Sequence, residues 1–231
     1  MTRDIQSADA PLTDFEQTAK SMEGIASLYG LCAACLSAEP SEELISELRA
    51  MRFPAHTGNE HIDEGYRDIA TYFSRVGSTA VGELAADYSR TFIGGGIDSF
   101  SAAYPFESVH VSRKRLLMQD ARDEVMAIYK AYGLEKSGQM KEGEDHIAYE
   151  LEFLKALCER CAAALREGDV EQAESLARAQ QGFMTDHLMR WVGKFTAQMR
   201  HFSKTDFYHG VSHLTFGACK EHEALLAEML S

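Results

Sequence analysis

Positive charge is scarce in this chain of 231 residues, where 23 Lys and Arg oppose 36 Asp and Glu and the formal net charge is −13. A protein that binds nucleic acid needs a basic face for the phosphates, so this balance argues against a nucleic-acid partner. It argues equally against docking on an anionic membrane. A basic partner, such as a peptide that carries arginines, is attracted instead.

Long apolar runs are also missing. The longest largely apolar stretch, residues 28–38, is far too short for a membrane-spanning helix. Residues 1–16 lack the apolar core of a secretory signal, so we expect a cytoplasmic protein. The five cysteines are an odd number, and in that compartment they should stay reduced.

Strand patterns are nearly absent, and the chain has only four prolines. No apolar–polar alternation extends beyond a few residues, and neither Asn-Gly nor Asp-Gly occurs. Apolar residues recur at helical spacing instead, so the sequence predicts an all-α fold of roughly nine or ten helices in a single globular domain. We expect residues 1–12 to be a flexible N-terminus and residues 13–231 to form the domain, with a hinge at 94–117.

The helical patterns cover residues 15–36, 42–51, 60–76, 79–92, 120–132, 146–166, 170–185, 188–202 and 207–229. Ser41, Asp145, Asp169 and Asp206 have the chemistry of N-caps for the helices that they precede. The triple glycine at 94–96 should end the fourth helix, because glycine loses the most backbone entropy in a helix.

Two Cys-x-x-Cys pairs, Cys32/Cys35 and Cys158/Cys161, have the spacing of a zinc or iron–sulfur site. However, three of the four cysteines fall on the apolar stripes of continuous helices, and Cys35 falls on a flank. Buried cysteine behaves as a small hydrophobic residue, so we expect them to belong to the core.

His209 and His213 are spaced by one helical turn and could hold a metal ion on one helix face, with Asp206 one turn earlier. A second helix with Glu-x-x-His is missing, since the only such pattern is Glu107–His110 in a loop. We therefore expect a solvated flank. The phosphate-binding Gly-x-x-x-x-Gly-Lys-Ser/Thr pattern and the Gly-x-Ser-x-Gly nucleophile turn are both absent, so nothing assembles an active site.

The pair Asp145-His146 is the more informative signal. Asp145 is placed to cap a helix that begins at His146, with Glu150 one turn later on the same face. The positive end of the helix dipole disfavours an imidazolium there, so His146 should stay neutral. A neutral histidine at a helix start can form a hydrogen bond with a ligand.

Three motifs occur in order along the chain: Tyr88-x-x-x-Phe92 with Tyr104-Pro105-Phe106-Glu107-Ser108-Val109, then Gly143-Glu144-Asp145-His146-Ile147-Ala148-Tyr149-Glu150-Leu151-Glu152-Phe153-Leu154, then Phe183-x-x-x-His187-Leu188-x-x-Trp191. Together they resemble the TorD/DmsD/NarJ-like family of chaperones, also called redox enzyme maturation proteins. In that family a proline usually stands at the position of Gly143, and a leucine at that of Thr91.

The resemblance implies a cytoplasmic, cofactor-free helical chaperone that is not an enzyme. Such proteins bind the twin-arginine signal peptide and the apo-form of a molybdopterin-containing oxidoreductase, the client. They assist cofactor insertion and proofreading before export, as monomers or as homodimers that include domain-swapped ones. The motifs do not identify the client. The alternative is a metal- or nucleotide-dependent enzyme built from the histidines and cysteines.

The residues that the resemblance assigns to client binding are Tyr88, Phe92, Tyr104, Pro105, Phe106, Glu107, Ser108, Asp145, His146 and Glu150. We expect their aromatic members, Tyr88, Phe92, Tyr104 and Phe106, to line an apolar groove. We expect their carboxylates, Glu107, Asp145 and Glu150, to meet arginines bidentately.

Overall fold

The computed structural model describes residues 14–94, 101–112, 120–134 and 142–231, and every structural statement below refers to these ranges. The N-terminus expected to be flexible, residues 1–12, lies outside them. The hinge expected at 94–117 falls partly outside them.

The described residues form ten α-helices, a π-helical turn and a 3₁₀ turn, and the prediction of an all-α fold is confirmed. The elements are α1 (Asp14–Leu36), α2 (Glu42–Ala50), α3 (Glu60–Arg75), α4 (Ala80–Tyr88), η1 (Ser89–Ile93), α5 (Glu107–Val111), α6 (Asp120–Ala131), α7 (Ile147–Glu167), α8 (Val170–Asp186), η2 (Leu188–Arg190), α9 (Val192–Phe202) and α10 (Asp206–Met229). None of the described helices has the length and apolar character needed to cross a membrane.

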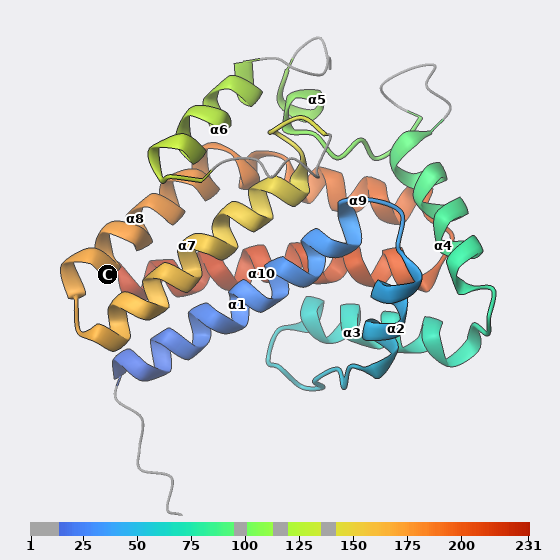
Figure 1. Ribbon diagram of the computed structural model, residues 1–231, viewed down its shortest axis with the longest axis horizontal. Helices are drawn as coiled ribbons and strands as arrows, with labels where there is room; N and C mark the ends of the chain where they lie inside the picture. The colour runs from blue at the N-terminus through green and yellow to red at the C-terminus, as the bar shows by residue number, and fades with distance from the viewer. Residues whose placement is uncertain (1–13, 95–100, 113–119, 135–141) are drawn as a thin grey trace, which may run out of the picture.

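Four long helices surround the core. α1 packs along α7, α8 packs on α7, and α10 contacts α1 and α8, which closes the set (Figure 1). α3 lies along α10, while α5 and α6 lie near the N-terminal end of α7. The largest fully buried side chains in this core include Trp191, Tyr29, Tyr208 and Phe195.

All five cysteines are buried free thiols, so the prediction that they belong to the core is confirmed, and Cys35 is buried rather than on a flank. Cys158 contributes to a polar network inside the core. His222 accepts a hydrogen bond from the Tyr29 hydroxyl at Nδ1 (3.0 Å) and donates one from Nε2 to Oε1 of Gln180 (3.0 Å), which also accepts from the Cys158 thiol (3.1 Å). The network satisfies polar groups that burial would otherwise leave unpaired.

Several helix ends differ from the predictions. Ser41 and Asp169 cap α2 and α8 as expected. Asp206, however, is the first residue of α10, and Thr205 is its N-cap. The reason is Asp87 of α4, whose buried carboxylate accepts hydrogen bonds from the backbone N–H groups of Lys204 (3.0 Å) and Thr205 (2.8 Å), which fixes the chain immediately before α10.

Two predicted helices are interrupted, and one short helix was not predicted. The pattern over residues 79–92 is α-helical only to Tyr88 and then widens into η1, which ends at Gly94 with φ +62°. The pattern over 188–202 begins as the 3₁₀ turn η2 and becomes α-helical after Trp191. The short helix α5 lies in the segment expected to be a loop.

Candidate functional site

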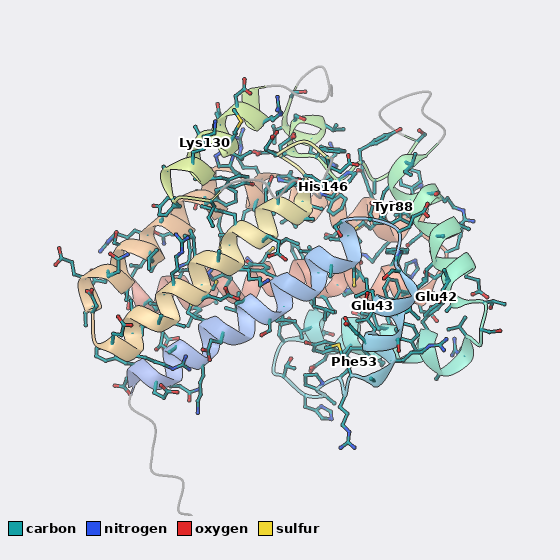
Figure 2. All side chains as sticks on the ribbon, in the orientation of Figure 1. Glu42, Glu43, Phe53, Tyr88, Lys130 and His146 are labelled. Atoms are coloured by element: carbon teal, nitrogen blue, oxygen red, sulfur yellow. The ribbon has the colours of Figure 1, made fainter. Side chains whose placement is uncertain are left out.

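The segment before α5 and the segment before α7 are joined by backbone hydrogen bonds. Phe106 and His146 form an isolated antiparallel bridge, in which the N–H of Glu107 donates to the carbonyl of Asp145 (2.9 Å) and the N–H of Ile147 donates to the carbonyl of Pro105 (2.9 Å). Figure 2 shows His146 at the start of α7. The bridge places the segment Tyr104–Val109 of the first motif beside Asp145 and His146 of the second motif.

His146, and not Asp145, is the N-cap of α7. Its Nδ1 accepts a hydrogen bond from the N–H of Ala148 (3.1 Å), so the expectation that Asp145 caps this helix is wrong. Asp145 instead accepts a hydrogen bond at Oδ2 from the N–H of Ser108 (3.0 Å), in the first turn of α5. Because burial lowers the pKa of His146 to about 3, the prediction of a neutral imidazole is confirmed.

Two further acids of the site pair with residues that follow α8. The Nδ1–H of His187 donates to the carboxylate of Glu107 at 3.0 Å. The indole Nε1–H of Trp191 donates to Oε2 of Glu150 at 3.2 Å. Both carboxylates are fully buried. Helices α5 and α7 are therefore each connected to the η2 turn by a buried polar contact.

The acidic side chains influence one another through space. Burial and the charge of Glu107 raise the pKa of Glu150 well above its usual range, and Asp145 adds to this effect. Burial also raises the pKa of Tyr129 of α6, and the charges of Glu150 and Glu107 raise it further. Glu107, Asp145 and Glu150 therefore form a buried acidic cluster, and no Lys or Arg is among the buried side chains that the structure describes.

Polar atoms in this cluster are left without partners. Within the described ranges, Oγ of Ser108, Oδ1 of Asp145 and Oε1 of Glu150 are buried and have no hydrogen bond. A buried polar group without a partner costs roughly 1–3 kcal/mol. The site therefore retains hydrogen-bonding capacity that a bound donor could use.

The aromatic residues of the first motif divide into two groups. Tyr88 and Phe92 pack with a centroid distance of 4.9 Å, and both are buried in the core, where Phe92 also contacts Phe195 and Tyr208. Figure 2 labels Tyr88 at the end of α4. In this structure these two side chains lie in the core and not on a groove. Their aromatic rings support the packing of α4 and η1 on α9 and α10.

Tyr104 and Phe106 are only half-buried. Phe106 meets the imidazole of His146 edge-to-face at a centroid distance of 5.0 Å. The carbonyl of Tyr104 pairs with Nε2 of His110 (2.8 Å), and the ring of His110 stacks on Trp191 at 5.1 Å. Pro105 is buried beside them. These residues form the partly exposed border of the acidic cluster.

The structure thus brings together eight of the ten residues predicted for the site, from Tyr104 to Ser108 and from Asp145 to Glu150, and leaves Tyr88 and Phe92 in the core. The three carboxylates that we expect to meet arginines are all fully buried in this structure. His187, Trp191 and Tyr129 were not among the residues expected at the site. The third motif contained His187 and Trp191, whereas no sequence signal pointed to Tyr129.

An apolar cavity with acidic residues lies elsewhere, between α1, α3 and α10. It has a volume of about 430 Å³, and Ile25, Leu28 and Ile62 line it together with Glu221 and Glu228. Its lining comes from the middle of α1, the start of α3 and the C-terminal part of α10, and it includes none of the three acids of the cluster. It is therefore a separate surface that a peptide could use.

Comparisons with known proteins define the class to which this helical fold and its Asp-His site belong. The model of the nitrate reductase delta subunit family matches residues 59–197, which include both sides of the acidic cluster. The chain belongs to this family. The resemblance to TorD/DmsD/NarJ-like proteins that the motifs predicted is confirmed.

Curated relatives make the similarity more specific. The chain is 29% identical over 147 residues to the chaperone protein TorD of Vibrio parahaemolyticus, a match that covers 62% of this chain and 64% of the relative. It is 30% identical over 144 residues to the chaperone protein TorD of Photobacterium profundum, with the same coverage of 62% and 64%. The chain thus matches a little under two thirds of the length of these relatives.

Proposed function

We propose that this chain is a chaperone, and not an enzyme, that assists the maturation of a molybdopterin-containing oxidoreductase. In this proposal it binds the client's twin-arginine signal peptide and its apo-form in the cytoplasm and supports cofactor insertion and proofreading before export. Residues 13–231 form one chaperone domain with a hinge at 94–117, and the chaperone itself holds no cofactor. The relatives named as chaperones and the family match support the general role.

The observation that carries the peptide-binding part is the buried acidic cluster. Glu107, Asp145 and Glu150 are buried together, and two of them have a carboxyl oxygen without a hydrogen bond among the described residues. A guanidinium offers five N–H donors in a planar fork and a permanent positive charge. An arginine would therefore offset the repulsion and satisfy the unpaired oxygens together.

Access to this cluster requires α5 to move away from α7. The helix has only five residues, and backbone hydrogen bonds at Glu107 and Ile147 and the contact from Ser108 to Asp145 attach it to the start of α7. Small elements with few contacts open locally at a lower free-energy cost than the whole fold. The half-buried rings of Tyr104 and Phe106 would then be free to contact the apolar part of the signal peptide.

The net charge of −13 supports the same partner at longer range. A chain with excess negative charge attracts a basic peptide and raises its rate of association, and this effect falls as salt is added. Ten methionines and twelve phenylalanines supply adaptable apolar contacts.

Calorimetric titration of the full chain with a synthetic twin-arginine signal peptide tests the proposal. The peptide should carry both the twin-arginine stretch and the apolar segment of a molybdenum oxidoreductase signal sequence. We expect saturable binding with an affinity in the micromolar range, about −8 kcal/mol. A peptide with both arginines replaced by lysine should bind more weakly, because an ammonium cannot form the bidentate fork. No saturable heat from a folded protein at high peptide concentration would contradict the proposal.

The alternative enzyme gains no support from the cysteines. Burial raises the pKa of Cys32 to about 12 and raises that of Cys158 well above its usual range, so neither supplies a reactive thiolate near neutral pH.

A further inference from the structure

Helices α3 and α10 approach each other unusually closely at two glycines. A Cβ atom on Gly65 would lie 2.8 Å from the carbonyl oxygen of Gly210, and a Cβ atom on Gly210 would lie 2.6 Å from that of Gly65. Only glycine permits this contact, since real Cβ atoms do not come so near to backbone oxygens. Figure 1 shows α3 running beside α10. The close crossing sets the polar residues that flank the two glycines opposite one another.

Three metal-ligating side chains meet at this crossing. One carboxylate oxygen each from Glu64 and Asp68 on α3 and one imidazole nitrogen from His213 on α10 all lie within 4.8 Å of one another. The nearest pair is Oε2 of Glu64 and Nδ1 of His213, at 3.6 Å. All three side chains are half-buried. The prediction of a solvated flank for His213 is therefore wrong, because its side chain is only 15% exposed.

The imidazoles at this crossing have nitrogen atoms without hydrogen bonds. Nδ1 of His213 and Nε2 of His209 are both buried and have no hydrogen bond within the described part of the chain. His209 lies one helical turn before His213 and interacts electrostatically with both His213 and Asp68. Buried nitrogens of this kind usually find a partner, so their lack of one points to a missing ligand.

The electrostatics of the three groups favour a cation. Glu64 and Asp68 lie one turn apart on α3 with carboxylate oxygens within 4.8 Å, so their negative charges repel each other. Arg67 is the only cation paired with Glu64 in the described ranges besides His213, and this contact is long (3.7 Å) and well exposed.

We propose that Glu64, Asp68 and His213 bind a divalent transition-metal ion, with Zn²⁺ as the representative. Zinc bonds of about 2.0–2.1 Å place tetrahedral ligand atoms about 3.3 Å apart, close to the 3.6 Å between Glu64 and His213. The mixture of imidazole and carboxylate ligands favours such ions over Mg²⁺ and Ca²⁺, which prefer oxygen alone. The bound ion connects α3 to α10, two helices that are far apart in the sequence. This role does not depend on the proposed chaperone function.

Titration of the full-length protein, stripped of metal with EDTA, tests this site. We expect Zn²⁺ alone to bind with a stoichiometry of one ion per chain and to raise the melting temperature, because the ion binds the folded state. Mg²⁺ at the same concentration should do neither. Absence of saturable Zn²⁺ binding would overturn the proposal.

Variants of the ligands locate the ion. Glu64→Gln, Asp68→Asn and His213→Gln should each weaken Zn²⁺ binding at least about tenfold. His201→Gln and Glu47→Gln are matched controls, because both side chains are exposed on other helices, and they should bind Zn²⁺ as the parent does. Circular dichroism without metal checks that each variant is folded. Unchanged Zn²⁺ affinity in all three ligand variants would contradict the assignment.

A measurement on the parent protein avoids the question of whether a variant folds. Substitution by Co²⁺ should produce a spectrum without the charge-transfer absorption of a thiolate ligand, and paramagnetic shifts should appear at the rings of His213 and His209. Thiolate absorption would place the ion at the buried cysteines instead. Shifts confined to other histidines would overturn the proposal as well.

Discussion

The carboxylate of Glu107 and the imidazole of His187 form a buried ion pair or hydrogen bond, with Oε2 3.0 Å from Nδ1. Glu107 is the first residue of α5, and His187 is the C-cap of α8. The contact therefore fixes a short helix from one part of the chain on the end of a long helix from another. It also aligns η2, from which Trp191 reaches Glu150.

The first prediction concerns the charge of Asp145. Asp145→Asn keeps an oxygen that can accept the hydrogen bond from Ser108, so α5 should stay attached and the melting temperature should remain near that of the parent. The variant removes one charge that an arginine would contact, and affinity for the twin-arginine peptide should fall on the order of tenfold, about 1.4 kcal/mol. Calorimetry measures this change.

Asp14→Asn is the matched control for that experiment, because Asp14 is exposed in the first turn of α1 and also loses one negative charge. It should bind the peptide nearly as the parent does. If Asp145→Asn and Asp14→Asn behave alike, the peptide does not use the acidic cluster. The cavity lined by Ile62 and Glu221 then becomes the surface to test.

The second prediction concerns the cap of α7. His146→Ala removes the acceptor for the N–H of Ala148 and should lower the free energy of unfolding by about 1 kcal/mol or more. His146→Asn supplies a side-chain oxygen that caps well and should lose less. Urea unfolding at pH 7 compares the two variants. Equal losses would show that packing against Phe106, rather than capping, dominates.

The third prediction is a loss of stability in acid. Burial lowers the folded-state pKa of His146 and of His222 to about 3, from an ordinary value of 6.5. Between these values the unfolded chain binds more protons, so the stability contributed by each neutral histidine is complete above about pH 6.5 and decreases as the pH falls. Because each histidine gains a proton only on unfolding, each should lower the free energy of unfolding by about 2 kcal/mol between pH 7 and pH 5.

Glu150 acts in the opposite direction, because its raised pKa means that protonation in the folded state adds stability as the pH falls. Glu150 is present in both the parent and His146→Asn, so its contribution cancels when the two pH profiles are subtracted. The variant should lose about 2 kcal/mol less than the parent between pH 7 and pH 5. Identical pH profiles in urea unfolding would show that His146 is not held neutral by the fold.

The fourth prediction concerns the crossing of α3 and α10. Gly210→Ala places a Cβ atom against the carbonyl of Gly65, so it should lower the free energy of unfolding by roughly 1–3 kcal/mol through overpacking. Gly182→Ala is the matched control in α8, since nothing lies within 4 Å of its added Cβ. That variant should gain up to about 1 kcal/mol, because alanine favours the helix. Thermal unfolding that gave both variants the same sign would contradict the close approach.

The fifth prediction concerns two core cysteines. Cys158→Ala and Cys161→Ala should each lower the free energy of unfolding on the order of 1 kcal/mol, because each removes buried volume. The bound metal content of the purified protein should not change. Loss of zinc or of an iron–sulfur chromophore in the double variant would show that the cysteines are ligands.

Local chemistry made much of the secondary structure predictable. Ser41 and Asp169 cap their helices because the N-cap depends on one side chain and the amides a few residues later. The apolar stripe from Ile147 to Leu165 is buried along α7 as its spacing indicated. Periodicity of this kind depends on nearest neighbours along the chain, and so the sequence contains it directly.

The N-caps of α7 and α10 differ from the residues expected, because residues distant in sequence form hydrogen bonds near these helix starts. The carboxylate of Asp87 accepts hydrogen bonds from the backbone immediately before α10, and Thr205 is the N-cap there. The carboxylate of Asp145 accepts a hydrogen bond from the N–H of Ser108, and His146 is the N-cap of α7. Neither Asp87 nor Ser108 is near in sequence to the helix that it affects. No local pattern could have indicated them.

The sequence by itself determined the helical class, the family and the residues of the Asp-His motif, because these depend on local periodicity and on ordered motifs. Only the tertiary structure decided that Glu107, Asp145 and Glu150 are buried together, and that Glu64 and Asp68 face His213. Both arrangements join side chains from different helices, and burial and mutual distance arise only when those helices pack. The physical reason is that electrostatic interaction depends on distance through space and on the exclusion of water, neither of which sequence spacing specifies.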